Sequence, residues 1–330
     1  MRNIRLSLAL QGGAFVVPPS GRIAVWRPVA GDDLSALPQG RVTVLTGFRP
    51  DHDHFRALGF AVDPSAPYAA GVVCLTRSRA QMRALLAQAA DEVVPGGPIA
   101  VDGQKTDGID SVLRELGRRV ALSEPIAKAH GRIAVFAAGP GLADWRATDR
   151  DIDGFVTRPG VFSADGPDRG SELLAKALPE RLGPRVVDLG AGWGYLGRAI
   201  LAREGVERLD LVEAEAEALV CARRNITDPR ARFHWEDAGR FEPGEAVDTV
   251  VANPPFHVGR RPDPSIGEAF VTAAARMLRP AGALWLVANR HLPYDRVLAA
   301  QFSRVEAVGG DASFRIIRAT HPRRAGARGG

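Results

Sequence analysis

The stretch VVDLGAGWGYLG, residues 186–197, decides the fold of this 330-residue chain. Its apolar start predicts a buried strand that ends at Asp188, and Gly190, Gly192 and Gly194 follow directly before a predicted helix. Glycines at such a turn let a ligand approach backbone N–H groups closely. Dinucleotide-binding loops are spaced G-x-G-x-x-G, whereas this run is D-x-G-x-G-x-G. An acidic residue at the strand end suits a ligand with a cationic amine better than a pyrophosphate.

Strands and helices alternate on both sides of this loop. Apolar patterns predict helices over 172–182, 194–204, 216–226 and 266–278, and strands over 185–190, 208–214, 231–237, 248–255 and 282–289. Such alternation is typical of a parallel sheet with helices on both faces. The segment 140–158 is rich in Gly, Pro and Asp and lacks this periodicity, so it predicts a domain boundary.

The first half of the chain repeats part of the second half. At a constant offset of 185 residues, 95–113 lie over 280–298 without a gap, and 82–94 lie over 267–279. We therefore expect two similar α/β domains that arose by duplication. The same offset places residues 68–71 over Asn253–Phe256, and the first half has no glycine loop after an acidic strand. The first copy is predicted to keep the fold without the site.

Composition excludes several classes of protein. The chain is 45% hydrophobic and 25% charged, which is ordinary for a globular protein and excludes disorder, collagen and coiled coil. Its 2 cysteines cannot build a disulfide framework or a four-thiolate zinc site, and no apolar run is long enough to span a membrane. A cytoplasmic setting fits these features. Residues 6–17, LSLALQGGAFVV, are expected to form a buried first strand rather than a signal peptide.

The net charge of +5 is carried mainly by arginine. Residues 1–150 hold 18 basic and 14 acidic side chains, and residues 151–330 hold 25 and 24. Guanidinium groups suit phosphate recognition, although a GC-rich genome produces the same bias. The charge permits a nucleic-acid partner without demanding one.

Two further predicted strands end on acidic residues. Glu213 closes the strand over 208–214, and its carboxylate can accept both hydroxyls of a ribose. Asp237, followed by Ala238, ends the next strand and can receive an adenine amino group. With a cationic amine at Asp188, these groups describe S-adenosylmethionine. Taken singly, such acidic residues can also be helix caps.

The motif Asn253-Pro254-Pro255-Phe256 follows the apolar strand DTVVA. Two prolines remove N–H donors and fix the chain, which leaves the Asn253 side-chain oxygen and the Pro254 carbonyl free to accept hydrogen bonds from a planar amino group. That geometry turns the nitrogen lone pair toward a sulfonium methyl, and Phe256 offers a face for stacking a base. We expect these four residues to be catalytic; the alternative is a rigid turn.

DLGAGWG and NPPF together resemble class I S-adenosylmethionine-dependent methyltransferases that act on planar amino nitrogens. Four stretches are similar to the bacterial ribosomal RNA guanine-N2 methyltransferases of the RsmC/RlmG group: RPGVFSADGPDRGSELLAKAL (158–178), NPPFHVG (253–259), VANRHLPYDRVL (287–298) and ASFRIIRAT (312–320). LTRSRAQMRALLAQA (75–89) and GQKTDGIDSVLREL (103–116) resemble that group's degenerate N-terminal methyltransferase-like domain.

The resemblance implies two tandem Rossmann-like methyltransferase domains. A degenerate domain over 1–145 would be structural or bind RNA, a catalytic domain over 155–322 would hold a seven-stranded, mostly parallel sheet, and 323–330 would be a flexible basic tail. S-adenosylmethionine would be the co-substrate, the N2 amino group of a guanine the acceptor, and ribosomal RNA, within a small-subunit particle, the partner. A monomer without metal or membrane contact is expected. Phe162, Ser163 and Asp168 would line the site, with Phe162 among the cofactor-binding residues.

Other interpretations stay open. NPP-aromatic motifs also serve protein glutamine amides, although those enzymes usually carry tyrosine at the position of Phe256, and a non-catalytic RNA-binding or assembly factor is a third class. His257 and His291 have no positioned partner that would make either a base, and Arg260-Arg261 could read phosphates or solvate a loop. Asp51-His52-Asp53-His54 is expected to be a capped helix start rather than a metal site. The alternative for Phe162, Ser163 and Asp168 is a helix start, with Ser171 as the cap of ELLAKAL.

Overall fold

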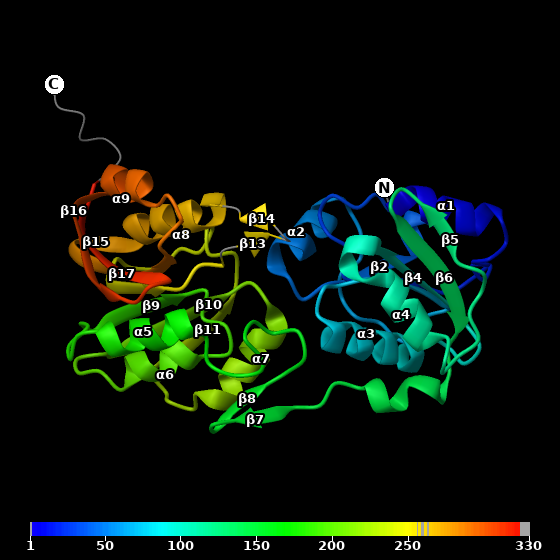
Figure 1. The fold of residues 1–330 in the computed structure, drawn as a ribbon, viewed down its shortest axis with the longest axis horizontal. Helices are drawn as coiled ribbons and strands as arrows, with labels where there is room; N and C mark the ends of the chain where they lie inside the picture. Colours follow the sequence, from blue (N-terminus) through cyan, green and yellow to red (C-terminus); the bar gives the residue numbers. More distant parts are fainter. Residues whose placement is uncertain (1, 256, 259–260, 263, 324–330) are drawn as a thin grey trace. The chain divides into compact units, whose positions relative to one another are not determined.

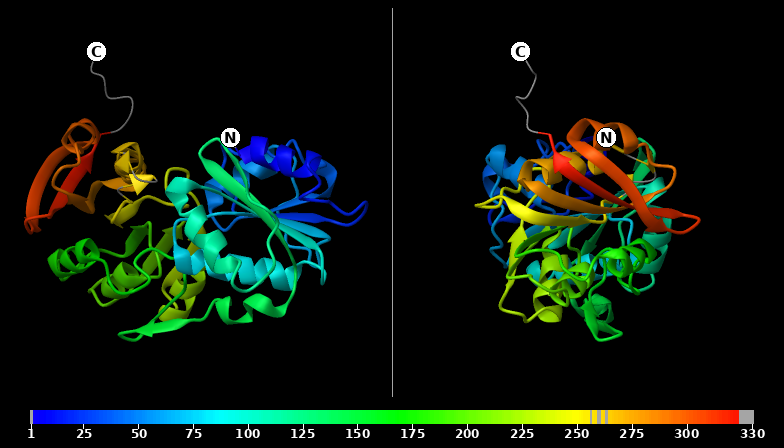
Figure 2. Two further views of the ribbon diagram at one scale, coloured as in Figure 1. Left: turned by 45° about the vertical axis from the view of Figure 1, so that its right-hand side comes forward. Right: turned by 90° about the vertical axis from the view of Figure 1, so that its left-hand side faces the viewer.

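The computed structural model describes residues 2–255, 257–258, 261–262 and 264–323 (Figure 1, Figure 2). Phe256 and residues 324–330 of the predicted tail lie outside this set. The chain divides into two compact units, Met1–Asp149 and Arg150–Gly330. Within the described residues, no helix has the length and apolar character needed to cross a membrane.

The second unit is built on a seven-stranded sheet, as predicted. Its strand order is β11-β10-β9-β12-β15-β17-β16. Neighbours from β11 to β15 run parallel, and β17 runs antiparallel to both β15 and β16. The bounds are β9 Arg185–Leu189, β10 Arg208–Glu213, β11 Ala231–Trp235, β12 Val247–Ala252, β15 Leu278–Asn289, β16 Phe302–Gly310 and β17 Phe314–Pro322.

Helices cover both faces of this sheet (Figure 1). One face packs against α5 and α6, with α7 beside them, and the other face packs against α8 and α9. Successive strand side chains point to opposite faces, so Val186 joins the first core and Val187 the second. The helices are α5 Arg169–Ala177, α6 Tyr195–Leu201, α7 Ala216–Asn225, α8 Pro264–Met277 and α9 Asp295–Gln301; the short pairs are β7 Arg150–Ile152 with β8 Phe155–Thr157, and β13 His257–Val258 with β14 Arg261–Pro262.

The first unit repeats this topology with one strand fewer. Its sheet has the order β2-β1-β3-β4-β6-β5, which matches the second sheet without the position of β11. Helices α3 and α8 begin and end 185 residues apart, which confirms the repeat. The strands are β1 Ile23–Trp26, β2 Val42–Leu45, β3 Ala70–Cys74, β4 Pro98–Gln104, β5 Ile126–Lys128 and β6 Gly131–Ala137. The α-helices are α1 Arg2–Gln11, α2 Arg49–Ala57, α3 Arg79–Glu92 and α4 Ile109–Leu116, and the 3-10 turns are η1 Gln39–Arg41, η2 Lys105–Asp107 and η3 Pro140–Trp145.

The predicted N-terminal strand is wrong, because residues 2–11 form helix α1. Leu6 and Ala9 lie about one helical turn apart and are both buried. Arg5 is also fully buried, since its guanidinium pairs with Asp102 through two contacts of 2.7 Å. The helix thus buries an apolar face and a paired charge together.

The alignment of residues 68–71 with Asn253–Phe256 is also wrong. Strand β3 holds the place in the first sheet that β12 holds in the second, so the residues after Cys74 are the counterparts of Asn253. The connection from β3 to α3, residues 75–78, is shorter than that from β12 to α8, residues 253–263. A constant offset therefore fails upstream of α3.

Candidate cofactor and substrate site

The predicted site residues gather at the carboxyl ends of β9, β10 and β12. The chain leaves β9 toward β10 and β11 on one side, and later returns to β12 on the other side. In open α/β sheets, ligands bind at such a switch point, outside the carboxyl ends of the strands. Asp188, Glu213 and Asn253 all lie at or directly after these strand ends.

The glycine loop after β9 has left-handed backbone at each predicted glycine. The φ angles are +80° at Gly190, +55° at Gly192 and +94° at Gly194. A side chain at Gly194 would come within 2.9 Å of Ile226, whereas one at Gly192 would meet nothing within 4 Å. Gly192 therefore presents bare backbone to open space.

Asp188 is a buried carboxylate without a side-chain partner in the described part of the chain. It is 0% exposed, and neither oxygen forms a hydrogen bond of normal geometry there. Burial, and next the negative charge of Glu213, raise the pKa of Asp188 to about 8, although the nearby N–H of Gly197 opposes this. Because an unpaired buried carboxylate is costly, the position suits a cationic or donating ligand group.

Glu213 holds the glycine loop. Its Oε2 accepts a hydrogen bond from the Gly192 N–H at 2.8 Å, and its Oε1 accepts one from the Glu215 N–H at 2.8 Å. Burial raises the pKa of Glu213, and these N–H donors offset the effect only in part. Since each carboxylate oxygen can accept more than one hydrogen bond, the carboxylate keeps capacity for ligand hydroxyls.

Asp237 and Ala238 form a turn after β11. Asp237 Oδ1 accepts from the Gly239 N–H at 2.9 Å, and its Oδ2 lies 4.0 Å from the Arg240 guanidinium. Ala238 is buried in the core on the α8 side.

Asn253 has a fixed amide. Its Nδ2 donates to Asp168 Oδ2 at 2.9 Å and to Ser171 Oγ at 2.8 Å. Its Oδ1 is buried and forms no hydrogen bond among the described residues. Pro254, which follows, is buried, and Pro255 is exposed. The Asn253 side chain is left with an unused acceptor.

One pocket joins several predicted residues from both halves of the site, although Asp188, Glu213, Asp237 and Ala238 do not line it. It is lined by residues of the PGVFS segment, the start of α5, the glycine loop and Asn253: Phe162, Ser163, Asp168, Ser171, Gly190, Ala191, Gly192, Trp193, Tyr195, Leu196 and Asn253. The Phe162 side chain is 58% exposed, so its ring is available to a ligand. The helix cap is Asp168, which accepts from the Ser171 N–H at 3.0 Å, so the alternative with Ser171 as the cap is wrong.

Two supporting residues were not found from the sequence. Trp193 Nε1 donates to the Phe162 carbonyl at 2.9 Å and so ties the glycine loop to the PGVFS segment. Asn225, at the end of α7, donates to the carbonyls of Trp193 at 2.8 Å and of Val156 at 2.9 Å, and accepts from the Val156 N–H at 2.6 Å. The position of Trp193 within the glycine motif was a signal for its role, whereas the sequence held no signal for Asn225.

The remaining candidates lie apart from the pocket or outside the description. His291 is exposed in the turn after β15, and the side chains of His257 and Arg261, with all of Arg260, lie outside the described residues. Residues 51–54 lie within α2 rather than before it; Asp51 accepts from the Ala30 N–H and Asp53 pairs with Arg49. The described residues contain no group of three or more His, Cys, Asp or Glu suited to a metal ion.

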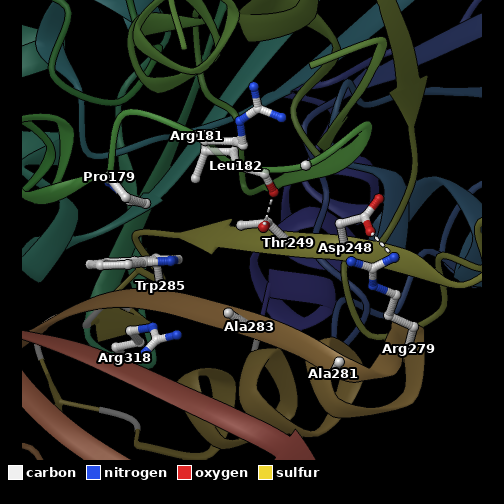
Figure 3. A pocket seen from close by; sticks show the side chains of 11 residues that line it. Pro179, Arg181, Leu182, Asp248, Thr249, Arg279, Ala281, Ala283, Trp285 and Arg318 are labelled. Carbon is white, nitrogen blue, oxygen red and sulfur yellow. Dashed lines mark hydrogen bonds and ion pairs between the residues drawn. The ribbon is translucent and has the colours of Figure 1, made fainter. Parts of the chain in front are cut away.

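A second cavity, of about 550 Å³, lies at the amino ends of the strands, on the side of the sheet away from the glycine loop (Figure 3). It opens at the amino ends of β12 and β15, where Arg279 faces Asp248 at 2.6 Å. Trp285 lies between Pro179 and Arg318, and the Arg318 guanidinium is 5.9 Å from its ring centre. The Asp248 carboxylate in this cavity is thus already paired.

Comparisons with known proteins agree with this geometry. The family described as Methyltransferase small domain matches residues 153–318. The chain is 27% identical to Ribosomal RNA small subunit methyltransferase C of Hahella chejuensis, over 92% of both chains. It is 30% identical to the protein of that name from Shewanella baltica (strain OS195), over 71% of this chain and 70% of the relative. Ribosomal RNA large subunit methyltransferase G of Streptomyces avermitilis is 37% identical over 48% of this chain and 43% of its own length.

A solved structure matches both units. The T. thermophilus 16S rRNA N2 methyltransferase RsmC, in complex with AdoMet and guanosine, has a TM-score of 0.78 and 26% identity, covering 97% of this chain and 91% of the other. The resemblance inferred from the glycine loop and NPPF is thereby confirmed, as is S-adenosylmethionine as the co-substrate. This chain belongs to the methyltransferase small-domain family, among the class I S-adenosylmethionine-dependent ribosomal RNA methyltransferases.

Proposed function

We propose that this protein methylates the exocyclic N2 amino group of a guanine in ribosomal RNA. The observation that carries the proposal is the unused, buried Oδ1 of Asn253 beside the glycine loop. A fixed acceptor at this point selects a substrate that donates, as an amino group does. The relatives are named for ribosomal RNA, and one solved relative was captured with guanosine.

The cofactor side of the site would use the residues predicted from the sequence. Asp188 would receive the cationic amine, because its carboxylate is buried and lacks a side-chain partner within the described residues. Glu213 would take the ribose hydroxyls while it holds the loop of Gly190, Gly192 and Gly194 in place. The remaining contacts would come from Asp237, Ala238, Phe162 and Asn253.

The substrate side would work by positioning. When bound, S-adenosylmethionine supplies a methyl group on a positively charged sulfur. Asn253 Oδ1 and the Pro254 carbonyl would accept the two amino hydrogens of the guanine, so that its nitrogen lone pair faces that methyl. Pro255 has no N–H to compete, and Phe256 would stack on the flipped base. The C–S bond breaks as the N–C bond forms, the methylated nitrogen releases a proton to water, and no covalent enzyme intermediate is needed.

The wider assignments belong to the same proposal. The first domain, residues 1–145, would support the catalytic domain, residues 155–322, or bind RNA, in keeping with its surplus of basic side chains. The substrate would be presented within a small-subunit particle, because several relatives are named for that subunit. The protein would act as a cytoplasmic monomer without metal.

Nucleoside mass spectrometry of ribosomal RNA tests the reaction. Cells that lack this protein should lose one N2-methylguanosine, which the wild-type chain restores and Asn253→Ala does not. An unchanged nucleoside profile with intact S-adenosylmethionine binding would favour a protein glutamine amide as the acceptor. Absence of S-adenosylmethionine binding would favour a non-catalytic assembly factor.

A further inference from the structure

The polarity of the Asn253 amide is set by residues outside the NPPF motif. A side-chain amide carries a donor and an acceptor of nearly equal size, so either can face a given neighbour. In this protein, Nδ2 faces the start of α5, where it donates to Asp168 at 2.9 Å and to Ser171 at 2.8 Å. The other end of the amide, Oδ1, then decides which substrates can bind.

The orientation of the Asn253 amide depends first on a backbone N–H, which can only donate a hydrogen bond. The Ser171 N–H donates to Asp168 Oδ2 at 3.0 Å, as the cap of α5. The same Oδ2 is the atom that receives Asn253 Nδ2. A carboxylate oxygen only accepts, so Asn253 must turn its NH₂ group toward it. Oδ1, the acceptor, is left for the substrate.

The packing around Asp168 keeps this oxygen in place. A side-chain carbon at Gly170 would come within 3.0 Å of Asp168 Oδ2 and within 3.3 Å of Phe314 and Val287. Ser171 is 8% exposed, so its hydroxyl is held inside the protein beside the amide. The start of α5 is thus a rigid frame for Asn253.

We infer that Asp168 is a positioning residue that fixes the amide of Asn253 with its oxygen toward the substrate, and so makes the site specific for an amino-group donor. The inference rests on the proposed function. A flipped amide would present NH₂ to the guanine amino group, and two donors would then face each other. Asp168 acts through Asn253 and need not touch the reacting atoms.

Two substitutions at position 168 separate this role from helix capping. Asp168→Ser keeps a good cap, but its shorter side chain cannot reach both Ser171 N–H and Asn253. Asp168→Asn is isosteric, and the Ser171 N–H keeps its oxygen at the place of Oδ2. Asp165→Asn is the matched control, because this carboxylate pairs only with exposed Arg150 in the described structure, at 2.7 Å.

The test is steady-state methylation of unmethylated ribosomal RNA, with calorimetric S-adenosylmethionine binding and thermal melting for every variant. Asp168→Ser should lower kcat by about 10²-fold, the loss expected from misplacing a catalytic group by about 1 Å, with cofactor affinity and melting temperature near wild type. Asp168→Asn and Asp165→Asn should stay within about 3-fold of the wild-type kcat. The double variant Asp168→Ser/Asn253→Ala should be no slower than Asn253→Ala alone, since residues that act as a unit are not additive.

The outcomes separate a failure of the positioning role of Asp168 from a failure of the proposed guanine-N2 methylation. A wild-type kcat in Asp168→Ser, an equal loss in Asp168→Asn, or losses that multiply in the double variant would overturn the positioning role. If the wild-type protein forms no N2-methylguanosine, or if Asn253→Ala is fully active, the proposed function itself fails.

Discussion

Replacing Asp188 with asparagine should stabilise the protein at pH 8 while weakening its hold on S-adenosylmethionine. Burial, then the charge of Glu213, raise the pKa of Asp188 from its ordinary value of 3.8 to about 8. The folded state therefore keeps a proton that the unfolded chain has already lost. The stability gained in this way is complete below about pH 4 and is lost progressively as the pH rises to about 8.

The size of the effect follows from the shift. One pKa unit corresponds to about 1.4 kcal/mol, so the whole shift from 3.8 to about 8 is worth about 6 kcal/mol as an upper bound. The side chain introduced by Asp188→Asn is neutral at every pH, so the variant would lack this loss. Urea unfolding of wild type and Asp188→Asn at pH 5, 6.5 and 8 measures it: the free-energy difference between them should grow by a few kcal/mol in favour of the variant as the pH rises.

Asp210 is the matched control in the same sheet. It is 1% exposed, but it pairs with His234 at 2.7 Å and with Arg208 at 2.8 Å. Burial alone would raise its pKa, yet the hydrogen bonds from His234 and Arg208 outweigh burial and lower the pKa. Its stabilisation is therefore present above the unfolded pKa and lost in acid, so Asp210→Asn should destabilise the protein at pH 7.

Ligand binding gives the second measurement on Asp188. If its carboxylate receives the cofactor amine, binding at pH 6.5 must release about one proton, which calorimetry in two buffers of different ionisation enthalpy detects. Asp188→Asn should release none and bind about 10- to 100-fold more weakly, the loss of one hydrogen bond to a charged group. A wild-type proton release near zero, or a pH-independent difference in stability, would refute the account of Asp188.

Three further predictions concern the glycine loop, its support and the first unit. Gly192→Ala should cost about 1–2 kcal/mol of stability, because its φ is +55°, and should weaken S-adenosylmethionine binding, because the new methyl occupies the space in front of the loop; calorimetry that finds full affinity would contradict this. Asn225→Ala removes three hydrogen bonds, two with Val156 of β8 and one with Trp193 of the loop, so the free energy of unfolding should fall by about 2–3 kcal/mol and the KM for S-adenosylmethionine should rise. An unchanged KM would mean that the loop needs no such support. Arg5→Leu leaves Asp102 buried with less charge compensation, so urea unfolding should show a loss of about 3–5 kcal/mol while cofactor affinity stays constant, and a loss below about 1 kcal/mol would speak against the buried pair.

Local pattern predicted the elements of the second unit well, and its errors at their ends have local causes. The predicted helix over 172–182 is observed at Arg169–Ala177. It starts earlier because Asp168, not Ser171, supplies the cap. It stops before Leu178 because the residue preceding Pro179 is driven out of the helical region. The spacing of apolar residues predicts neither the cap at Asp168 nor the helix end before Pro179.

Contacts between distant residues could not be predicted from pattern. Asn253 and Asp168 are 85 residues apart, and Arg5 and Asp102 are 97 apart. The sequence identified Asn253 as an acceptor and Asp168 as a residue near the site, but not that one orients the other. Likewise, the apolar residues 6–17 predicted a strand, and no local pattern showed that Arg5 beside them pairs with the distant Asp102.

The two units compensate a buried aspartate in different ways. Both sheets carry a buried aspartate near the carboxyl end of a strand, Asp188 on β9 and Asp102 on β4. The two positions are not equivalent, because β9 corresponds to β1 and β4 corresponds to β15. Asp102 is neutralised from within, by Arg5 at 2.7 Å and Arg2 at 3.0 Å from helix α1. Asp188 has no such side-chain partner in the described part of the second unit.

Burying a carboxylate is costly unless its charge is compensated. The first unit meets this requirement with its own N-terminal helix, and a cationic ligand would have no charge left to bind at Asp102. In the second unit, the Asp188 carboxyl stays protonated until the cationic amine of the cofactor compensates its charge. Cofactor binding is therefore coupled to proton release. The two units therefore differ in how a buried aspartate is compensated: by the arginines of a helix in the first, and by a bound ligand in the second.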